Sequence, residues 1–171
     1  MNLSTRFVTR SAIMIALAVG FQALGLQQAI TGPVINAILL ISAEFVGPLS
    51  GILVGLITPW MAVTTGIFKG PAPVIPVIIA GNLALVVVFA LSRKINRLAG
   101  GALAAVAKYA AMTAGIKLLI ARQIPLKPPI VVAMTMTQLY TAIGGVALAL
   151  AVMKGMEALG RSRMTGGRDQ A

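Results

Sequence analysis

Long apolar runs, separated by short polar or Gly-Pro segments, occupy most of the chain from residue 8 onward. Proline is tolerated in the first turn of a helix but disrupts its interior. The Gly-Pro pairs that end at Pro33, Pro48 and Pro71 therefore predict points at which a new helix starts. We predict six helices, over residues 8–26, 33–46, 48–66, 73–92, 101–121 and 129–153.

The second predicted helix, residues 33–46, is the shortest. At 1.5 Å per residue it reaches about 21 Å, whereas the hydrocarbon core of a bilayer is about 30 Å thick. We expect this helix to be tilted or sunk within a bundle. The loop before it, with Gln27, Gln28 and Thr31, is then expected to dip into the protein, where non-helical backbone is allowed if it lines a cavity.

The composition identifies lipid as the solvent for these helices. Hydrophobic residues make up 58% of the 171 residues and charged residues 10%, which leaves too little polar surface to cover a water-soluble protein. We predict an all-α integral membrane protein, a compact bundle of six transmembrane helices over residues 1–155. Residues 156–171 are predicted to form a basic, disordered cytoplasmic tail.

Basic residues lie almost entirely between the apolar runs and predict the orientation. Cytoplasmic loops of membrane proteins retain Lys and Arg. If the N-terminus is cytoplasmic, only Lys69, Arg122 and Lys127 fall outside, and the C-terminus is cytoplasmic too. The inner basic residues are then Arg6, Arg10, Arg93, Lys94, Arg97, Lys154, Arg161, Arg163 and Arg168.

The first apolar run follows Arg6 and Arg10, which is also how a secretory signal begins. A retained first helix explains the same pair as a cytoplasmic anchor, and we favour it because several further spans follow. The net charge of +11 would suggest nucleic acid in a soluble protein, but no basic cluster interleaved with aromatics is present. We therefore predict no nucleic-acid partner.

Small residues four positions apart mark faces on which membrane helices approach closely. The first predicted helix carries such a stripe, formed by Ala12, Ala16 and Gly20. The third carries another, with Gly51 and Gly55 following Gly47. Each stripe serves either packing within the bundle or docking of a partner membrane subunit, and spacing alone does not decide between them.

Polar residues deep in membrane helices are costly and usually face the bundle interior or a cavity. Asn82, Thr113 and Gln138, from three predicted helices, lie at nearly the same depth, about 12 to 14 Å from the outer ends. Thr135 and Thr141, three positions on either side of Gln138, extend its polar face. These side chains either line one pocket or only join helices through hydrogen bonds worth about 0.6 to 2 kcal/mol each.

Two lysines fall inside the fifth predicted helix. Lys117 shares a face with Thr113 and lies about one turn from the outer end, so it either meets an anionic group of a ligand or snorkels to the interface. Lys108, nine positions away and about 180° around the helix, is expected to face something else. Trp60 and Tyr140 either stack on a ligand ring or fill space.

Several kinds of chemistry are missing from the sequence. There is no Cys or His, and Glu44 is the only acid before Glu157. We find no phosphate-binding G-x-x-x-x-G-K-[ST] motif, no paired carboxylates and no nucleophile with a base. We therefore predict a protein that is not an enzyme, has no cofactor or metal, and does not power transport by itself.

Taken together, the chain resembles the substrate-binding S component of an energy-coupling factor (ECF) vitamin transporter over about residues 5–153. The resemblance rests on six short spans and on Ala12 and Ala16, which match the family's docking motif for a transmembrane coupling subunit. It also rests on the run from Thr31 to Ala37 and on a further series of small and polar residues: Gly47, Gly51, Gly55, Pro59, Pro73, Pro76, Gly81 and Asn82.

The resemblance implies a protein of the prokaryotic plasma membrane that binds a small vitamin or precursor. It further implies a partner coupling subunit, ATP-binding subunits, and an outward-opening pocket built from the loop after the first helix and from helices four to six. The expected substrate-binding residues are Asn82, Gln138, Thr113, Lys117, Thr135, Gln28, Thr31 and Asn36, and the docking residues are Ala12, Ala16 and Gly20.

Two other classes of function remain open. One is a membrane scaffold, such as a cell-shape subunit, which would bind no small molecule and would tolerate loss of Asn82 and Gln138. The other is a membrane enzyme, against which the missing acid, base and metal ligands argue. The few aromatic residues disfavour thiamin or riboflavin as the ligand, and a small, partly anionic vitamin is the expectation.

Overall fold

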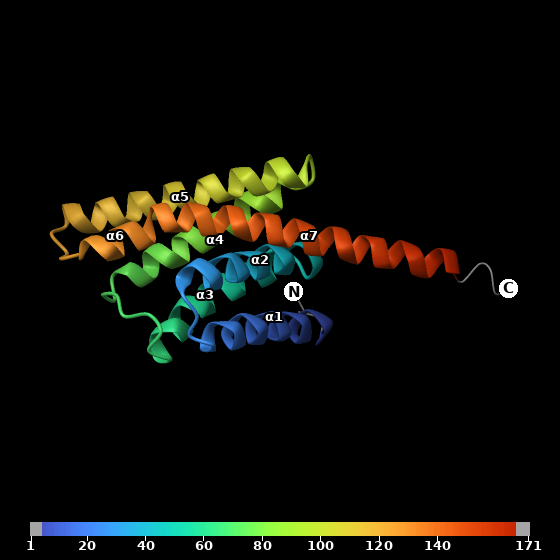
Figure 1. Ribbon diagram of the computed structural model, residues 1–171, viewed down its shortest axis with the longest axis horizontal. Helices are drawn as coiled ribbons and strands as arrows, with labels where there is room; N and C mark the ends of the chain where they lie inside the picture. Colours follow the sequence, from blue (N-terminus) through green and yellow to red (C-terminus); the bar gives the residue numbers. More distant parts are fainter. Residues whose placement is uncertain (1–4, 167–171) are drawn as a thin grey trace.

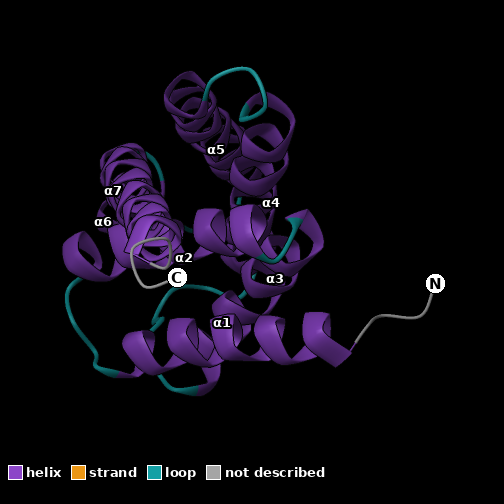
Figure 2. Cartoon of the chain, turned by 90° about the vertical axis from the view of Figure 1, so that its right-hand side faces the viewer, coloured by secondary structure: helices purple, strands orange, loops and turns teal. Residues whose placement is uncertain are grey.

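The computed structural model describes residues 5–166, and all of the regular structure in that range is helical. The helices lie side by side along the long axis of the molecule (Figure 1), and α1 lies at the edge, tilted relative to the others (Figure 2). The prediction of an all-α fold is confirmed for this part of the chain. The helices are α1 (Thr5–Ala23), α2 (Gln28–Phe45), α3 (Pro48–Thr64), α4 (Val74–Ser92), α5 (Arg97–Ala121), α6 (Pro128–Met134) and α7 (Met136–Gly166).

The second helix starts earlier than predicted. α2 begins at Gln28 and has 18 residues, about 27 Å at 1.5 Å per residue, with Pro33 inside it. The expected loop at Gln28 and Thr31 is therefore the first turn of this helix, where the amide of Thr31 donates to the carbonyl of Gln27. Pro33 removes one amide donor near the start of the helix, a loss that does not end it.

The fifth helix also starts earlier than predicted, at Arg97. Asn96 caps it, because its side-chain oxygen accepts hydrogen bonds from the amides of Leu98 and Ala99. Gly100 and Gly101 suggested a break, but both lie inside α5. They provide space for neighbouring helices: a Cβ on Gly101 would come within 2.4 Å of Val146 in α7.

The last predicted helix is two helices. α6 ends at Met134, the backbone of Thr135 is non-helical, and α7 continues directly from Met136 to Gly166. Residues 156–166 therefore belong to a helix, whereas the sequence predicted that they are disordered. They include good helix formers such as Met156 and Leu159. Residues 167–171 of the predicted tail lie outside the described range.

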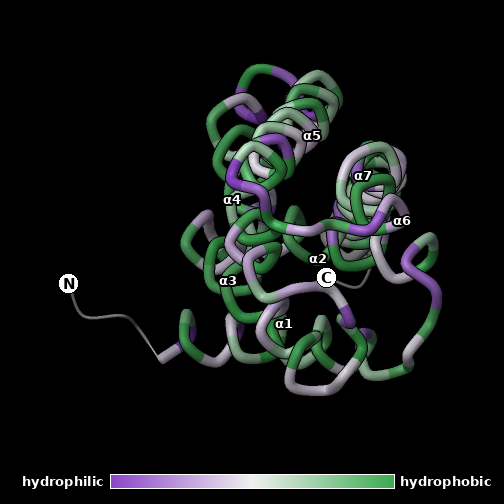
Figure 3. Tube along the Cα trace, turned by 90° about the vertical axis from the view of Figure 1, so that its left-hand side faces the viewer, coloured by the Kyte–Doolittle hydropathy of each residue, from purple (hydrophilic) through white to green (hydrophobic). Residues whose placement is uncertain are grey.

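Within residues 5–166, four helical segments are long and apolar enough to cross a membrane: α2, α4, α5, and α6 with α7. α3 is apolar but has only 17 residues, and α1, which carries Arg6 and Arg10, is not among the four. Hydrophobic residues occupy outer as well as inner faces of the helices (Figure 3). On α5, for example, Leu103, Val106 and Leu118 are each more than half exposed, as expected for side chains that face lipid.

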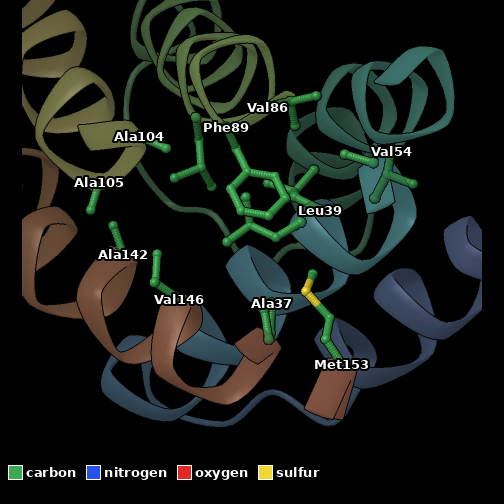
Figure 4. Close-up of a cluster of buried hydrophobic side chains, with 14 of the residues drawn as sticks. Ala37, Leu39, Val54, Val86, Phe89, Ala104, Ala105, Ala142, Val146 and Met153 are labelled. Carbon is green, nitrogen blue, oxygen red and sulfur yellow. The ribbon is translucent and has the colours of Figure 1, made fainter. Parts of the chain in front are cut away.

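The main hydrophobic core lies where α2, α3, α4, α5 and α7 meet, with Phe89 and Leu39 pointing into it (Figure 4). Close approach of α3 depends on small residues. A Cβ on Gly51 would lie 2.9 Å from the carbonyl oxygen of Leu39, and a Cβ on Gly55 would lie 3.1 Å from the Cβ of Asn82. The glycines of α3 therefore serve packing inside the bundle.

Basic residues gather at one end of the bundle, which we call the basic end. The α2–α3 and α4–α5 connections and the start of α1 lie there, on the right in Figure 1, and the other connections lie at the opposite end. At the basic end Glu44 forms an ion pair with Arg93 and lies 2.9 Å from Arg97, which also pairs with Glu157. Glu44 thus joins α2 to the α4–α5 connection. Which end faces the cytoplasm stays a prediction.

Candidate site: a cavity with a buried lysine

A cavity of about 230 Å³ opens near the α1–α2 and α3–α4 connections, away from the basic end. That volume is far more than one water molecule needs. Apolar side chains such as Ile35, Phe68 and Ile78 form part of its wall. Its polar lining comes from six helices: Gln22, Gln28, Thr31, Asn36, Thr58, Asn82, Lys108 and Gln138.

Lys108 is the only charged residue that lines the cavity in the described part of the chain. It lies near the middle of the 25-residue α5 and is 3% exposed. Its ammonium nitrogen Nζ lies 2.6 Å from Oδ1 of Asn36 and 2.8 Å from Oδ1 of Asn82, and it donates a hydrogen bond to each. An ammonium group has three donors, so one is left for another acceptor.

No carboxylate balances this lysine within the described residues. The chain has three acidic residues; Glu44 and Glu157 bind arginines at the basic end, and Asp169 lies outside the described range. A buried charge normally has a partner, and an ionisable group inside a membrane span usually marks a functional site. Lys108 is therefore the most informative residue of the cavity.

Two glycines set the positions of the asparagines that hold Lys108. Gly55 lets Asn82 approach α3 closely, and the Nδ2 of Asn82 donates to the carbonyl of Gly55 at 3.2 Å. On the other side, Gly145 of α7 faces Asn36, because a Cβ there would come within 2.4 Å of the Cβ of Asn36. Both amides therefore project from positions where the helices are in close contact.

The break between α6 and α7 forms another part of the wall. The carbonyl of Ala133, one residue before the end of α6, accepts hydrogen bonds from the side-chain nitrogens of Gln28 and Gln138, each at 3.3 Å. This arrangement links the start of α2 to α7 across the cavity. Non-helical backbone at such a depth is found where it is buried or lines a cavity.

An unused acceptor lies in the same cavity. The side-chain oxygen Oε1 of Gln22, near the end of α1, is buried and accepts no hydrogen bond from the described residues. A buried acceptor without a donor costs about 1 to 3 kcal/mol. The cavity thus offers a cationic donor at Lys108 and an acceptor at Gln22.

Five of the eight predicted substrate-binding residues line this cavity: Gln28, Thr31, Asn36, Asn82 and Gln138. The other three do not. Lys117 is exposed on the opposite side of α5 from Lys108, and Thr113 follows the buried Met112 on that helix. Thr135 donates to the carbonyl of Val131 at the helix break.

Two aromatic residues that could have stacked on a ligand also lie elsewhere. Trp60 is 54% and Tyr140 71% exposed, and neither lines the cavity. The cavity also extends further than expected. Besides the predicted residues, it includes Gln22 from α1 and Thr58 from α3.

No known protein family, curated protein or solved structure matches this chain. Among the described residues, no group of three or more His, Cys, Asp or Glu could hold a metal ion. The cavity can bind a small organic molecule through hydrogen bonds, apolar contact and one positive charge.

The two small-residue stripes have different surroundings. Gly51 and Gly55 of α3 are packed inside the bundle, whereas Ala12, Ala16 and Gly20 of α1 are exposed. A Cβ built on Gly20 meets no atom within 4 Å. The α1 stripe is therefore not used for packing within this chain.

Proposed function

We propose that this protein is the substrate-binding S component of an ECF transporter, which captures a small vitamin or vitamin precursor within the membrane. The observation that carries the proposal is the cavity, because polar side chains from six helices converge on it away from the basic end of the bundle. Polar side chains that only join helices would form hydrogen bonds with one another. They would not need an open volume of about 230 Å³ between the helices.

The proposed function needs partner subunits, because the chain has no evident source of energy for transport. It has no phosphate-binding loop and no acid near the middle of a described span, so neither ATP hydrolysis nor a proton or sodium gradient is accounted for by its own residues. In this proposal a transmembrane coupling subunit and ATP-binding subunits supply the energy. The protein spans a prokaryotic plasma membrane six times, with both termini in the cytoplasm.

A thermal-shift screen of the purified protein against vitamins and their precursors tests this function. A ligand present at 100 times its dissociation constant adds about 2.7 kcal/mol to the free energy of unfolding, which raises the melting temperature measurably. A selective shift with one compound supports the S component. If no compound shifts the melting temperature, the scaffold function replaces this proposal.

The exposed stripe of Ala12, Ala16 and Gly20 is the proposed docking surface for the coupling subunit, because small side chains let membrane helices approach closely. Ala12→Leu with Ala16→Leu should prevent co-purification with the coupling subunit and abolish uptake, while ligand binding is retained. The matched control places the same two substitutions at Ala110 and Ala114, exposed and four apart on α5. Equal loss of uptake in both double variants would refute docking through α1.

A further inference from the structure

We propose that the ligand is a monocarboxylate that binds with its carboxylate at Lys108 and presents an N–H or O–H donor to Gln22. This inference rests on the proposed function and adds the chemical class of the substrate. It starts from the geometry of Lys108, whose ammonium is fixed by Asn36 and Asn82 and has one donor left over at the cavity wall.

The charge balance indicates one negative charge on the ligand. Lys108 is the only cation on the cavity wall, and the described residues offer it no acidic partner. A carboxylate carries a single charge and accepts strong, charge-assisted hydrogen bonds from an ammonium group. A phosphate group carries about −1.5 to −2 at neutral pH and would leave excess negative charge in an apolar environment.

The rest of the cavity suits an organic body, not a bare ion. Ile35, Ile78 and Met134 offer apolar contact, and Oε1 of Gln22 is a buried acceptor that the described residues leave unused. A ligand with a carboxylate and a separate amide or hydroxyl group would satisfy both polar positions. An inorganic anion would satisfy only Lys108.

Matched pairs of an acid and its neutral analogue provide the probes: nicotinate with nicotinamide, pantothenate with panthenol, and biotin with biotinamide. We expect the wild-type protein to bind the acid of at least one pair about ten- to 150-fold more tightly than its neutral analogue, as measured by calorimetry. Lys108→Met should remove that preference. Inorganic phosphate should not compete with the acid.

The control uses the same substitution on the same helix. Lys117 is exposed on the opposite side of α5, so Lys117→Met should leave the acid preference unchanged. If Lys117→Met removes the preference and Lys108→Met does not, the placement of the carboxylate is wrong. If Lys108→Met does not fold, Asn36→Asp replaces it in the test.

Asn36→Asp puts a carboxylate of nearly the same shape where Oδ1 of Asn36 now lies, 2.6 Å from the ammonium nitrogen. The new carboxylate should form an ion pair with the ammonium group of Lys108 and raise the melting temperature of the protein without ligand. It should also reduce binding of the acid more than binding of its neutral analogue. Equal reduction for both compounds would contradict the inference.

The outcomes separate the two proposals. If a neutral analogue binds the wild-type protein as tightly as its acid, the protein is a binding subunit but the inference of a carboxylate is wrong. If neither the acids nor their analogues bind, and the wider vitamin screen also gives no shift, the proposed function and the inference both fall.

Discussion

Gly145 of α7 is the position where a single methyl group should disturb both the packing and the cavity. A Cβ there would lie 2.4 Å from the Cβ of Asn36, 2.9 Å from the carbonyl oxygen of Pro33 and 3.2 Å from the amide nitrogen of Ala37. Two of these atoms belong to the backbone, and the third is attached to it directly. None can rotate away, so Gly145→Ala must push α2 and α7 apart.

The magnitude follows from two opposing terms. Overpacking a tight contact costs about 1 to 3 kcal/mol, and the helix propensity gained on replacing Gly by Ala returns about 0.5 to 1 kcal/mol. Because the neighbouring atoms are rigid, we expect a net loss of about 1 to 2 kcal/mol in the free energy of unfolding. Asn36 should also move relative to Lys108, which weakens binding of a carboxylate ligand.

The adjacent residue provides the control. A Cβ on Gly144 would lie 3.4 Å from the ring carbons of Pro33, which is ordinary van der Waals contact. Gly144→Ala should therefore be neutral or should stabilise the protein by up to about 1 kcal/mol. Reversible unfolding in mixed SDS micelles, followed by circular dichroism, measures both variants. If their stabilities agree within about 0.5 kcal/mol, the close contact at Gly145 does not exist as described.

Two further predictions concern the site and the orientation. Asn82→Ala and Gln138→Ala should each weaken ligand binding about five- to 150-fold in calorimetry, since each leaves a buried group unpaired, whereas Thr113→Val, outside the cavity, should not. Unchanged affinity in both alanine variants would place the ligand elsewhere. A membrane-impermeant thiol reagent added to cells should label Ala72→Cys and spare Ile95→Cys, both at exposed positions in connections; the reverse pattern would invert the predicted orientation.

The existence of the helices could be read from the sequence because each apolar run became helical. The predicted helix boundaries were wrong where a helix continues through a residue that usually ends one. Pro33 lies inside α2, and Gly100 and Gly101 lie inside α5. In each case contact with a neighbouring helix outweighs the local preference, and such contacts have no signature in a single sequence.

The predicted depth of the polar residues identified two that line the cavity, but the sequence did not show which side of α5 faces it. Asn82 and Gln138 line the cavity as expected, whereas Thr113 does not and Lys108 does. In a soluble protein the apolar stripe of a helix reveals its inner face. α5 is apolar on its outer face as well, as expected for a helix that faces lipid, so hydrophobic periodicity could not show which polar residue points inward.

One signal for Lys108 was present in the sequence. The residue lies eleven positions from the start of α5 at Arg97 and thirteen from its end at Ala121, too far from either end for a lysine side chain to reach the interface easily. A lysine in that position must find partners inside the bundle. The central position of Lys108 was not evident because Gly100 and Gly101 led us to predict that the helix starts at residue 101, whereas α5 starts at Arg97.

Small residues in this chain have two kinds of surroundings, because some are packed against neighbouring helices and others are exposed. Gly55 and Gly145 bring α3 and α7 against the residues that hold Lys108. Ala12 and Ala16 lie on the exposed face of α1. The cavity touches α1 only near its far end, at Gln22. If α1 docks the proposed coupling subunit, a ligand that engages Gln22 would contact the same helix, and occupancy of the cavity would then be physically linked to docking.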